Sequence, residues 1–140
     1  MSQVKPIPDG YHSVQPYVMQ NNCAEAIAFY VKAFGAREKF RMPNERGGIG
    51  HAEIEIGDSV IMMADESVQM DAYSPQHFGG SPVSLLIYTE KCDEMYQQAL
   101  AAGAVSVREP ADQPYGDRMA GIKDPFGYKW WIATHIKDVQ

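Results

Sequence analysis

The sequence predicts an α+β fold built from two βαβββ modules, and an internal repeat is the main reason. In each half an apolar strand pattern precedes an amphipathic helix pattern that ends in Gly-Ala, at Gly35-Ala36 and again at Gly103-Ala104. A shift of about 68 residues superimposes the two halves. After each helix pattern, apolar residues recur at the period of two that is typical of strands. We therefore expect one domain, 1–140, with modules at about 12–66 and 82–136 and a linker at 67–81.

The first half is expected to contain four strands and one helix. Its elements are a strand at 14–19, a helix at Cys23–Phe34 that Asn21 or Asn22 caps, and strands at 37–42, Ile49–Ile56 and 59–64. The helix follows from apolar residues at helical spacing, with Gly35 as its end. In the strand at Ile49–Ile56, His51, Glu53 and Glu55 alternate with apolar residues, which indicates a sheet with one polar face. The turn Gly57-Asp58 predicts a hairpin.

The second half repeats this order after the linker. Its expected elements are strands at 83–88, 104–108, 118–123 and 128–134, a helix at 93–102 and a loop at 109–115. The linker carries Ser74-Pro75 and Gly79-Gly80-Ser81-Pro82, which are turn and loop signals rather than parts of a regular element.

The composition excludes several classes of protein. The net charge of −6 and the lack of a run of Lys or Arg argue against nucleic acid or an anionic membrane as a partner. No run of about 18 apolar residues is present to cross a membrane, and the first ten residues lack the apolar core of a signal peptide. Cys23 and Cys92 are two thiols in a small chain, which suggests a reducing compartment, so we expect a cytoplasmic protein.

Four motifs in the right order carry a resemblance to a known family. They are Ala26-Ile27-Ala28-Phe29-Tyr30 with Ala33-Phe34-Gly35-Ala36, then Gly50-His51-Ala52-Glu53-Ile54-Glu55-Ile56-Gly57-Asp58-Ser59, then Tyr115-Gly116-Asp117-Arg118, and finally Asp124-Pro125-Phe126-Gly127-Tyr128-Lys129-Trp130. With them, nearly the whole chain resembles the vicinal oxygen chelate superfamily, the glyoxalase and bleomycin-resistance fold, and its PhnB-like branch in particular. The resemblance implies a curved, half-open eight-stranded sheet with helices on the convex face, and a homodimer whose modules can be exchanged through the linker.

The resemblance also implies where a metal would bind. Members of the superfamily take one ligand from the first and one from the last strand of each module, and these positions here are Gln15, Met62, Ser84 and Trp131. Divalent metals in proteins prefer imidazole, thiolate, carboxylate or water. The four residues offer two weak oxygens, a soft thioether and an indole that cannot ligate. We therefore expect no metal at these positions and no cofactor.

His51 and Glu53 are the next candidates, because strand alternation places them on one face. They form either an acid–base pair, or part of a displaced metal site, or simply a polar face that meets water. Glu55 is expected either to meet water on this polar face or to make an ion pair with Lys39 or Arg41 on the neighbouring strand.

The remaining candidates form the wall of a pocket. Arg118 offers a forked guanidinium that suits a carboxylate or phosphate, unless it pairs with Asp117 or Asp124 to fix its own loop. Parity along the last strand directs Trp131 into the cavity and Trp130 away from it, and Trp131 either stacks on a ligand or fills the space of the metal. The expected ligand site lies between Tyr17, Met62, Leu86, Tyr115 and Trp131, with Gln15 and Ser84 beside it and Arg118 or the His51/Glu53 pair as the polar anchor.

Two main hypotheses for function follow. One is a metal-independent protein that binds an apolar or aromatic small molecule. The other is a metal-dependent lyase, isomerase or dioxygenase-like enzyme that uses His51 and Glu53. A third is a protein with a closed cavity and a purely interacting role. The sequence contains no phosphate-binding loop, nucleophile elbow or Cys-x-x-Cys motif, so NTP use, serine hydrolysis and thiol redox chemistry have no support.

Overall fold

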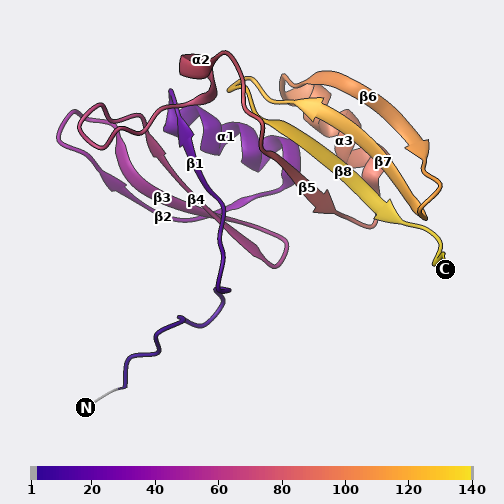
Figure 1. The fold of residues 1–140 in the computed structure, drawn as a ribbon, viewed down its shortest axis with the longest axis horizontal. Coiled ribbons are helices and arrows are strands. Elements are labelled where there is room, and N and C mark those ends of the chain that lie inside the picture. Colours follow the sequence, from indigo (N-terminus) through magenta and orange to yellow (C-terminus); the bar gives the residue numbers. More distant parts are fainter. Residues whose placement is uncertain (1–2, 140) are drawn as a thin grey trace.

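The computed structural model describes residues 3–139. Its elements follow one another as two similar series joined by a short helix (Figure 1). They are β1 Tyr17–Gln20, α1 Cys23–Phe34, β2 Arg37–Pro43, β3 Ile49–Ile56, β4 Ser59–Asp65, α2 Pro75–Phe78, β5 Ser84–Tyr88, α3 Cys92–Ala102, β6 Val105–Asp112, β7 Asp117–Lys123 and β8 Lys129–His135.

The eight strands form two open four-stranded sheets, in the orders β1-β4-β3-β2 and β5-β8-β7-β6. In each sheet the first strand pairs in parallel with the last, and the other pairs are antiparallel. The predicted α+β fold of paired βαβββ modules is therefore confirmed. Hydrogen bonding keeps the strands in two sheets of four rather than in one continuous sheet of eight.

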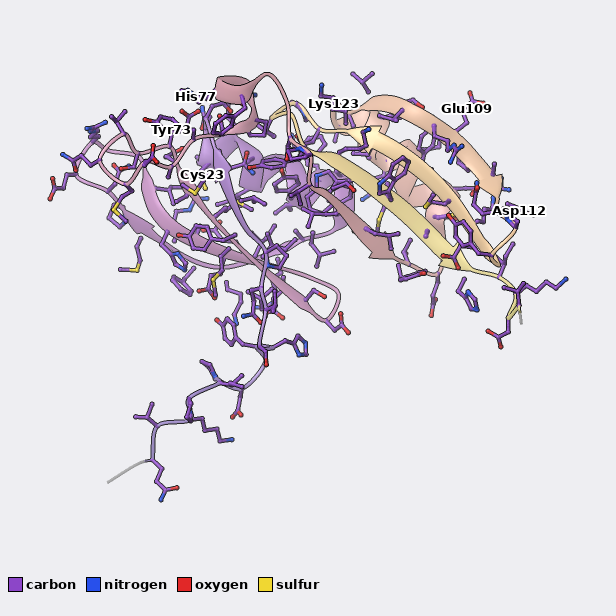
Figure 2. All side chains as sticks on the ribbon, viewed as in Figure 1. Cys23, Tyr73, His77, Glu109, Asp112 and Lys123 are labelled. Carbon is purple, nitrogen blue, oxygen red and sulfur yellow. The ribbon has the colours of Figure 1, made fainter. Side chains whose placement is uncertain are left out.

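Each long helix covers one face of its own sheet, and its first N–H is bound by a side chain of the last strand of its module. Asn22 caps α1 by accepting from the Glu25 N–H, and Gly35 ends it in the left-handed conformation that favours glycine. The N–H of Cys23 donates to Asp65 Oδ1 at the end of β4 (2.7 Å), and the N–H of Cys92 donates to Thr134 Oγ1 of β8 (2.9 Å). Cys23 lies at this buried start of α1 (Figure 2). The repeat thus extends to the contact between strand and helix.

The two modules meet through α1 and α3, which pack against each other. Gln98 of α3 donates to the carbonyl oxygens of Lys32 and Ala33 at the end of α1 (2.8 and 3.1 Å). The hydroxyl of Tyr30 on α1 donates to Asp124 Oδ2 in the second module (2.6 Å). One hydrophobic core runs through both modules, with Trp130, Tyr30, Ile54 and Met63 among its largest fully buried side chains.

Two strands differ from their predicted bounds for reasons that involve proline. The first strand begins at Tyr17 rather than at residue 14, since Pro16 has no N–H to donate and only its carbonyl pairs, with the N–H of Met62 (3.0 Å). The sixth strand runs to Asp112, through the predicted loop at 109–115. It lies at the edge of its sheet and has register shifts at Arg108, and an edge strand tolerates Pro110.

The faces of the sheets opposite the helices are open and partly apolar (Figure 1). The large hydrophobic side chains exposed in the strands include Tyr17, Phe40, Met42, Leu86, Tyr88, Val105 and Val107. Among the described residues no helix is long and apolar enough to pass through a bilayer.

Candidate ligand-binding site

The open face of the first sheet brings together four of the expected residues. Tyr17 of β1 lies beside Met62 of β4, which in turn lies opposite Glu53 of β3. Residues directly opposite one another in neighbouring strands share a face, and His51 is two residues from Glu53. Met62 is only partly exposed and Glu53 is buried, whereas nearly half of Tyr17 is open to solvent (48%).

A continuous chain of hydrogen bonds joins the polar groups on this face. The Tyr17 hydroxyl lies 2.8 Å from His51 Nδ1, and His51 Nε2 lies 2.8 Å from Glu53 Oε2. The other oxygen of Glu53 accepts from the hydroxyl of Tyr11. Lys39 Nζ donates to that same hydroxyl (2.9 Å) and lies over the Tyr11 ring. The chain therefore runs from a partly exposed phenol to an ammonium group.

The charges along this chain are well defined. Burial by itself raises the pKa of Glu53, but the hydrogen bonds from His51 and Tyr11 outweigh it and lower that pKa below its ordinary value. Burial is also the main reason that the pKa of Tyr17 is raised, with the nearby Cys23 and Glu53 adding to it. At neutral pH this chain of hydrogen bonds therefore contains a carboxylate at Glu53 and a neutral phenol at Tyr17.

The donor groups at the proposed metal positions do not fit a divalent cation. The side-chain oxygen of Gln15 accepts from the N–H of His12, and Ser84 Oγ accepts from Trp131 Nε1 (3.1 Å). Both nitrogens of His51 and both oxygens of Glu53 are engaged by protein partners, so a displaced metal site there would have to break this chain. Nowhere in residues 3–139 do three or more His, Cys, Asp or Glu side chains converge as a metal site.

The open face of the second sheet carries the other predicted wall residues. Leu86 of β5 lies beside Trp131 of β8, which lies opposite Gly121 of β7. The indole of Trp131 lies across Gly121 so closely that a Cβ added there would come within 2.5 Å of the ring. Trp131 is thus a partly exposed aromatic platform, while Trp130 is buried on the helix side, as parity predicts. Lys129 Nζ lies 5.7 Å from the Trp131 ring centre.

Arg118 lies on the opposite face from Trp131 and is fully paired. Its guanidinium donates to both carboxylate oxygens of Asp93 at the start of α3 (2.8 and 3.0 Å) and to Asp112 Oδ1 (3.0 Å). Asp112 lies at the end of β6, at the far side of the second module (Figure 2). The pairing partners are therefore neither Asp117 nor Asp124, because those carboxylates are bound by other side chains.

Two of the five expected wall residues, Tyr17 and Leu86, line different cavities. A cavity of about 660 Å³ is lined by Tyr17 together with the loops that contain Arg46 and Met70. A second, of about 490 Å³, is lined by Gln15 and Leu86 and lies where the two modules meet. Tyr115 is half exposed and its hydroxyl lies 3.6 Å from the sulfur of Met119. Glu55 pairs with Arg37 rather than with Lys39 or Arg41.

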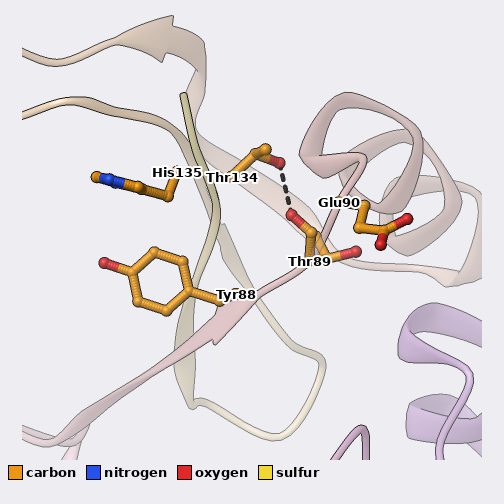
Figure 3. Close-up of a pocket in the computed structure, with 5 residues that line it drawn as sticks. All are labelled: Tyr88, Thr89, Glu90, Thr134 and His135. Carbon is orange, nitrogen blue, oxygen red and sulfur yellow. Dashed lines mark hydrogen bonds between the residues drawn. The ribbon is translucent and has the colours of Figure 1, made fainter. Parts of the chain in front are cut away.

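Sequence reasoning missed a second polar cluster, on the second sheet. Asp117 is buried and accepts from the Tyr88 hydroxyl and from His135 Nδ1 (2.8 Å each), and His135 Nε2 lies 2.6 Å from Asp138. Tyr88 and His135 line a cavity of about 680 Å³ together with Thr89, Glu90 and Thr134, whose hydroxyl donates to the Thr89 carbonyl (Figure 3). Alternation along β5 and β8 would have placed Tyr88 and His135 on one face.

Tyr11 was also missed, and the sequence offered no signal for it. It lies outside any regular element, and only the course of the N-terminal segment brings its hydroxyl to Glu53 and Lys39.

The comparisons with known proteins agree with this fold. Residues 12–132 match the family model described as the Glyoxalase/Bleomycin resistance protein/Dioxygenase superfamily. An uncharacterised protein of Mycobacterium bovis is 35% identical over 130 residues, covering 91% of this chain and 86% of that protein. An uncharacterised protein of Mycobacterium tuberculosis is also 35% identical over 130 residues, covering 91% of this chain and 76% of that protein.

Solved structures with lower identity show the same fold. TioX from Micromonospora sp. ML1 is 24% identical, with a TM-score of 0.68 over 89% of this chain and all of that one. A Bacillus cereus PhnB protein, described as a putative 3-demethylubiquinone-9 3-methyltransferase, is 17% identical, with a TM-score of 0.66 over 88% of this chain and 99% of that one. With the family model matching most of its length, the chain belongs to the glyoxalase/bleomycin resistance protein/dioxygenase superfamily.

Proposed function

We propose that the protein binds an apolar or aromatic small molecule on the open sheet faces, without a metal at the superfamily's ligand positions. The observation that carries this proposal is the platform of Trp131 over Gly121. A partly exposed indole that packs against its neighbouring strand offers aromatic surface for stacking, and Leu86 beside it extends the apolar surface. The donors at Gln15, Met62, Ser84 and Trp131 are too weak to compensate the dehydration of a divalent cation.

We further propose that the working form is a homodimer. Leu86 (46% exposed) and Tyr88 (63%) on the second sheet, like Tyr17 (48%) and Met42 (56%) on the first, leave more apolar surface uncovered than single scattered residues would. A second copy that set a first sheet against a second sheet would cover both faces and join the two halves of the pocket. Exchange of modules through the linker at 67–81 is one way to achieve this.

The free, buried thiols of Cys23 and Cys92 support a reducing compartment, and we propose the cytoplasm. The description of the family includes bleomycin resistance proteins, which makes binding rather than turnover a reasonable role for a member with these donors.

The binding proposal is tested by titrating a panel of planar aromatic acids and amines into three proteins, followed by calorimetry. These are the wild type, Trp131→Ala and, as a control, Phe78→Ala, which removes an exposed aromatic ring from α2. We expect Trp131→Ala to lose about 1 kcal/mol or more of binding free energy beyond the lost area, and Phe78→Ala to bind normally. Binding that is equal in wild type and Trp131→Ala, or no binding by any compound, would refute the proposal.

A further inference from the structure

We propose that Tyr17, His51 and Glu53 form a proton relay that binds an acidic hydroxyl compound, a phenol or an enol, as its anion. The inference rests on the proposed small-molecule function, but it concerns the first sheet and not the Trp131 platform. It assigns Tyr17 as the group that contacts the ligand oxygen, and His51 and Glu53 as the groups behind it.

In the proposed relay, the hydrogen bonds are donated toward Glu53. An ionised carboxylate only accepts, so both Tyr11 and His51 Nε2 donate to Glu53. In the proposed relay His51 is neutral, donates from Nε2 and accepts at Nδ1, so its partner there, the hydroxyl of Tyr17, is the donor. This assignment of the protons follows from the network. It leaves the lone pairs of the Tyr17 oxygen free to accept a hydrogen bond from a ligand.

Tyr17 lies at the wall of a space that suits a small organic molecule. Tyr17 lines the cavity of about 660 Å³ at the end of the first sheet. The apolar part of its wall comes from Met19, Ile49, Ala64, Met70 and Ala72, and the charged part from Glu45, Arg46, Asp65 and Glu66. Asp65 accepts from the N–H groups of Cys23 and Ile49, and Glu66 accepts from Ser74, so both carboxylates have partners within the protein. Ligand pockets typically combine an apolar wall with a few polar groups in this way.

The proton transfer balances without any further reactant. The ligand hydroxyl gives its proton to the Tyr17 oxygen, while the proton already on Tyr17 passes to Nδ1 of His51. The ligand becomes an oxyanion that accepts a hydrogen bond from Tyr17, and His51 becomes an imidazolium that donates to Tyr17 and to Glu53. Only O–H and N–H bonds form or break, no electrons change hands, and the net charge of the complex stays the same.

Glu53 is the charged group that contacts His51 directly. The titratable and charged groups on this face are Tyr11 of the N-terminal segment, Tyr17 of β1, Arg37 and Lys39 of β2, and Glu53 and Glu55 of β3, while β4 contributes the uncharged Met62. Arg37 and Glu55 pair with each other, and Lys39 is held by Tyr11. The Glu53 side chain is only 6% exposed and lies 2.8 Å from His51, so it acts on the imidazolium with little screening.

The test uses 4-nitrophenol, a planar phenol whose anion absorbs visible light and whose neutral form does not. Binding is measured by calorimetry and protonation by absorbance over a range of pH. The proteins are wild type, Tyr17→Phe, which removes the relay oxygen, and His51→Gln, which keeps a hydrogen-bonding partner for Tyr17 but cannot take up a proton. His77→Gln is the matched control, because His77 lies in α2, stacks on Tyr73 and has no part in the relay.

We expect wild type and His77→Gln to bind 4-nitrophenol as the anion, with its acid dissociation constant raised about tenfold or more in the complex. Tyr17→Phe and His51→Gln should bind it without that change. Three results would overturn the inference. They are an unchanged acid dissociation constant of 4-nitrophenol bound to wild type, a raised acid dissociation constant that survives in either relay variant, or no binding of 4-nitrophenol. If planar compounds still bind wild type and lose affinity in Trp131→Ala, the proposed function stands although the relay fails.

Discussion

At the scale of single residues, the contact between Trp131 and Gly121 decides the shape of the open face. A tryptophan at this position fills the space above the sheet unless a neighbouring residue leaves room for the ring against the strand. Gly121 does so, because a Cβ at 121 would come within 2.5 Å of the indole. Of the two roles that the sequence left open for Trp131, a stacking platform is therefore better supported than a plug.

We predict that Gly121→Ala destabilises the protein by about 1–3 kcal/mol, because the indole must move to admit the new methyl group. The measurements are urea unfolding and the emission of Trp131. The control is the same change in a Trp131→Ala background, where the cost should largely disappear, as expected for two residues in direct contact. Equal costs in the two backgrounds would show that the contact does not constrain the indole.

At the scale of elements, the sequence predicted what periodicity and glycine can determine. The bounds of α1 and β3 follow directly from the apolar spacing, from Gly35 and from the alternation of His51, Glu53 and Glu55. Strand β6 was missed beyond residue 108, because Pro110 and the register shifts of an edge strand remove the pattern by which a strand is recognised.

Site residues were predictable where the alternation of strand residues determines which face they occupy. Alternation places His51 and Glu53 on one face, and Trp131 opposite Trp130. Arg118 illustrates the limit, because its partner Asp93 lies 25 residues away on a helix and no local pattern links the two. Tyr11 reaches Glu53 across 42 residues for the same reason.

The cluster of Tyr88, Asp117 and His135 links β5, β7 and β8, and its contribution to stability should depend on pH. Hydrogen bonds to Asp138 and then to Asp117 raise the pKa of His135, because both carboxylates favour the imidazolium. A raised pKa in the folded state gives a stabilisation that is complete below the ordinary histidine value of about 6.5 and is lost as pH rises through the folded value. We predict that His135→Gln lowers the melting temperature at pH of about 5.5 but has little effect at about 9.

The matched control for this comparison is His12→Gln, a change in the exposed N-terminal segment. Its melting temperature should follow wild type across the same range. If the melting temperatures of wild type and His135→Gln differ by the same amount from acid to alkaline pH, the role given to Asp117 and Asp138 is contradicted.

At the scale of the whole molecule, two open sheets with apolar faces call for a partner. We predict that light scattering at micromolar concentration gives twice the 15.6 kDa of the chain. Leu86→Glu places a charge on the exposed face of the second sheet and should shift the protein to monomer, since burying an unpaired charge is costly. Val68→Glu alters a more exposed residue of the linker and should leave the dimer intact. A monomeric wild type would defeat this prediction.

The contact between the modules depends on one buried carboxylate. Asp124 is 4% exposed and accepts four hydrogen bonds, from Tyr30, Trp130 and the backbone N–H groups of Phe126 and Tyr128. We predict that Asp124→Ala lowers the free energy of unfolding by about 3 kcal/mol or more, because it leaves several buried donors without a partner. Urea unfolding measures this, with Asp58→Ala in the exposed turn of the first module as the control. A loss no larger than that of the control would rule out this role for Asp124.

The bond from Tyr30 to Asp124 also means that the two halves of the repeat are no longer interchangeable copies. Gln98 stands about 68 residues after Tyr30, and the turn of the first half offers only Asp58, which is exposed and bonded to Ser59. A symmetric version made by doubling the first half would leave the tyrosine hydroxyl without its acceptor. Doubling the second half would leave the aspartate without its tyrosine. A symmetric protein built from either half of this sequence would therefore require a redesign of the contact between Tyr30 and Asp124.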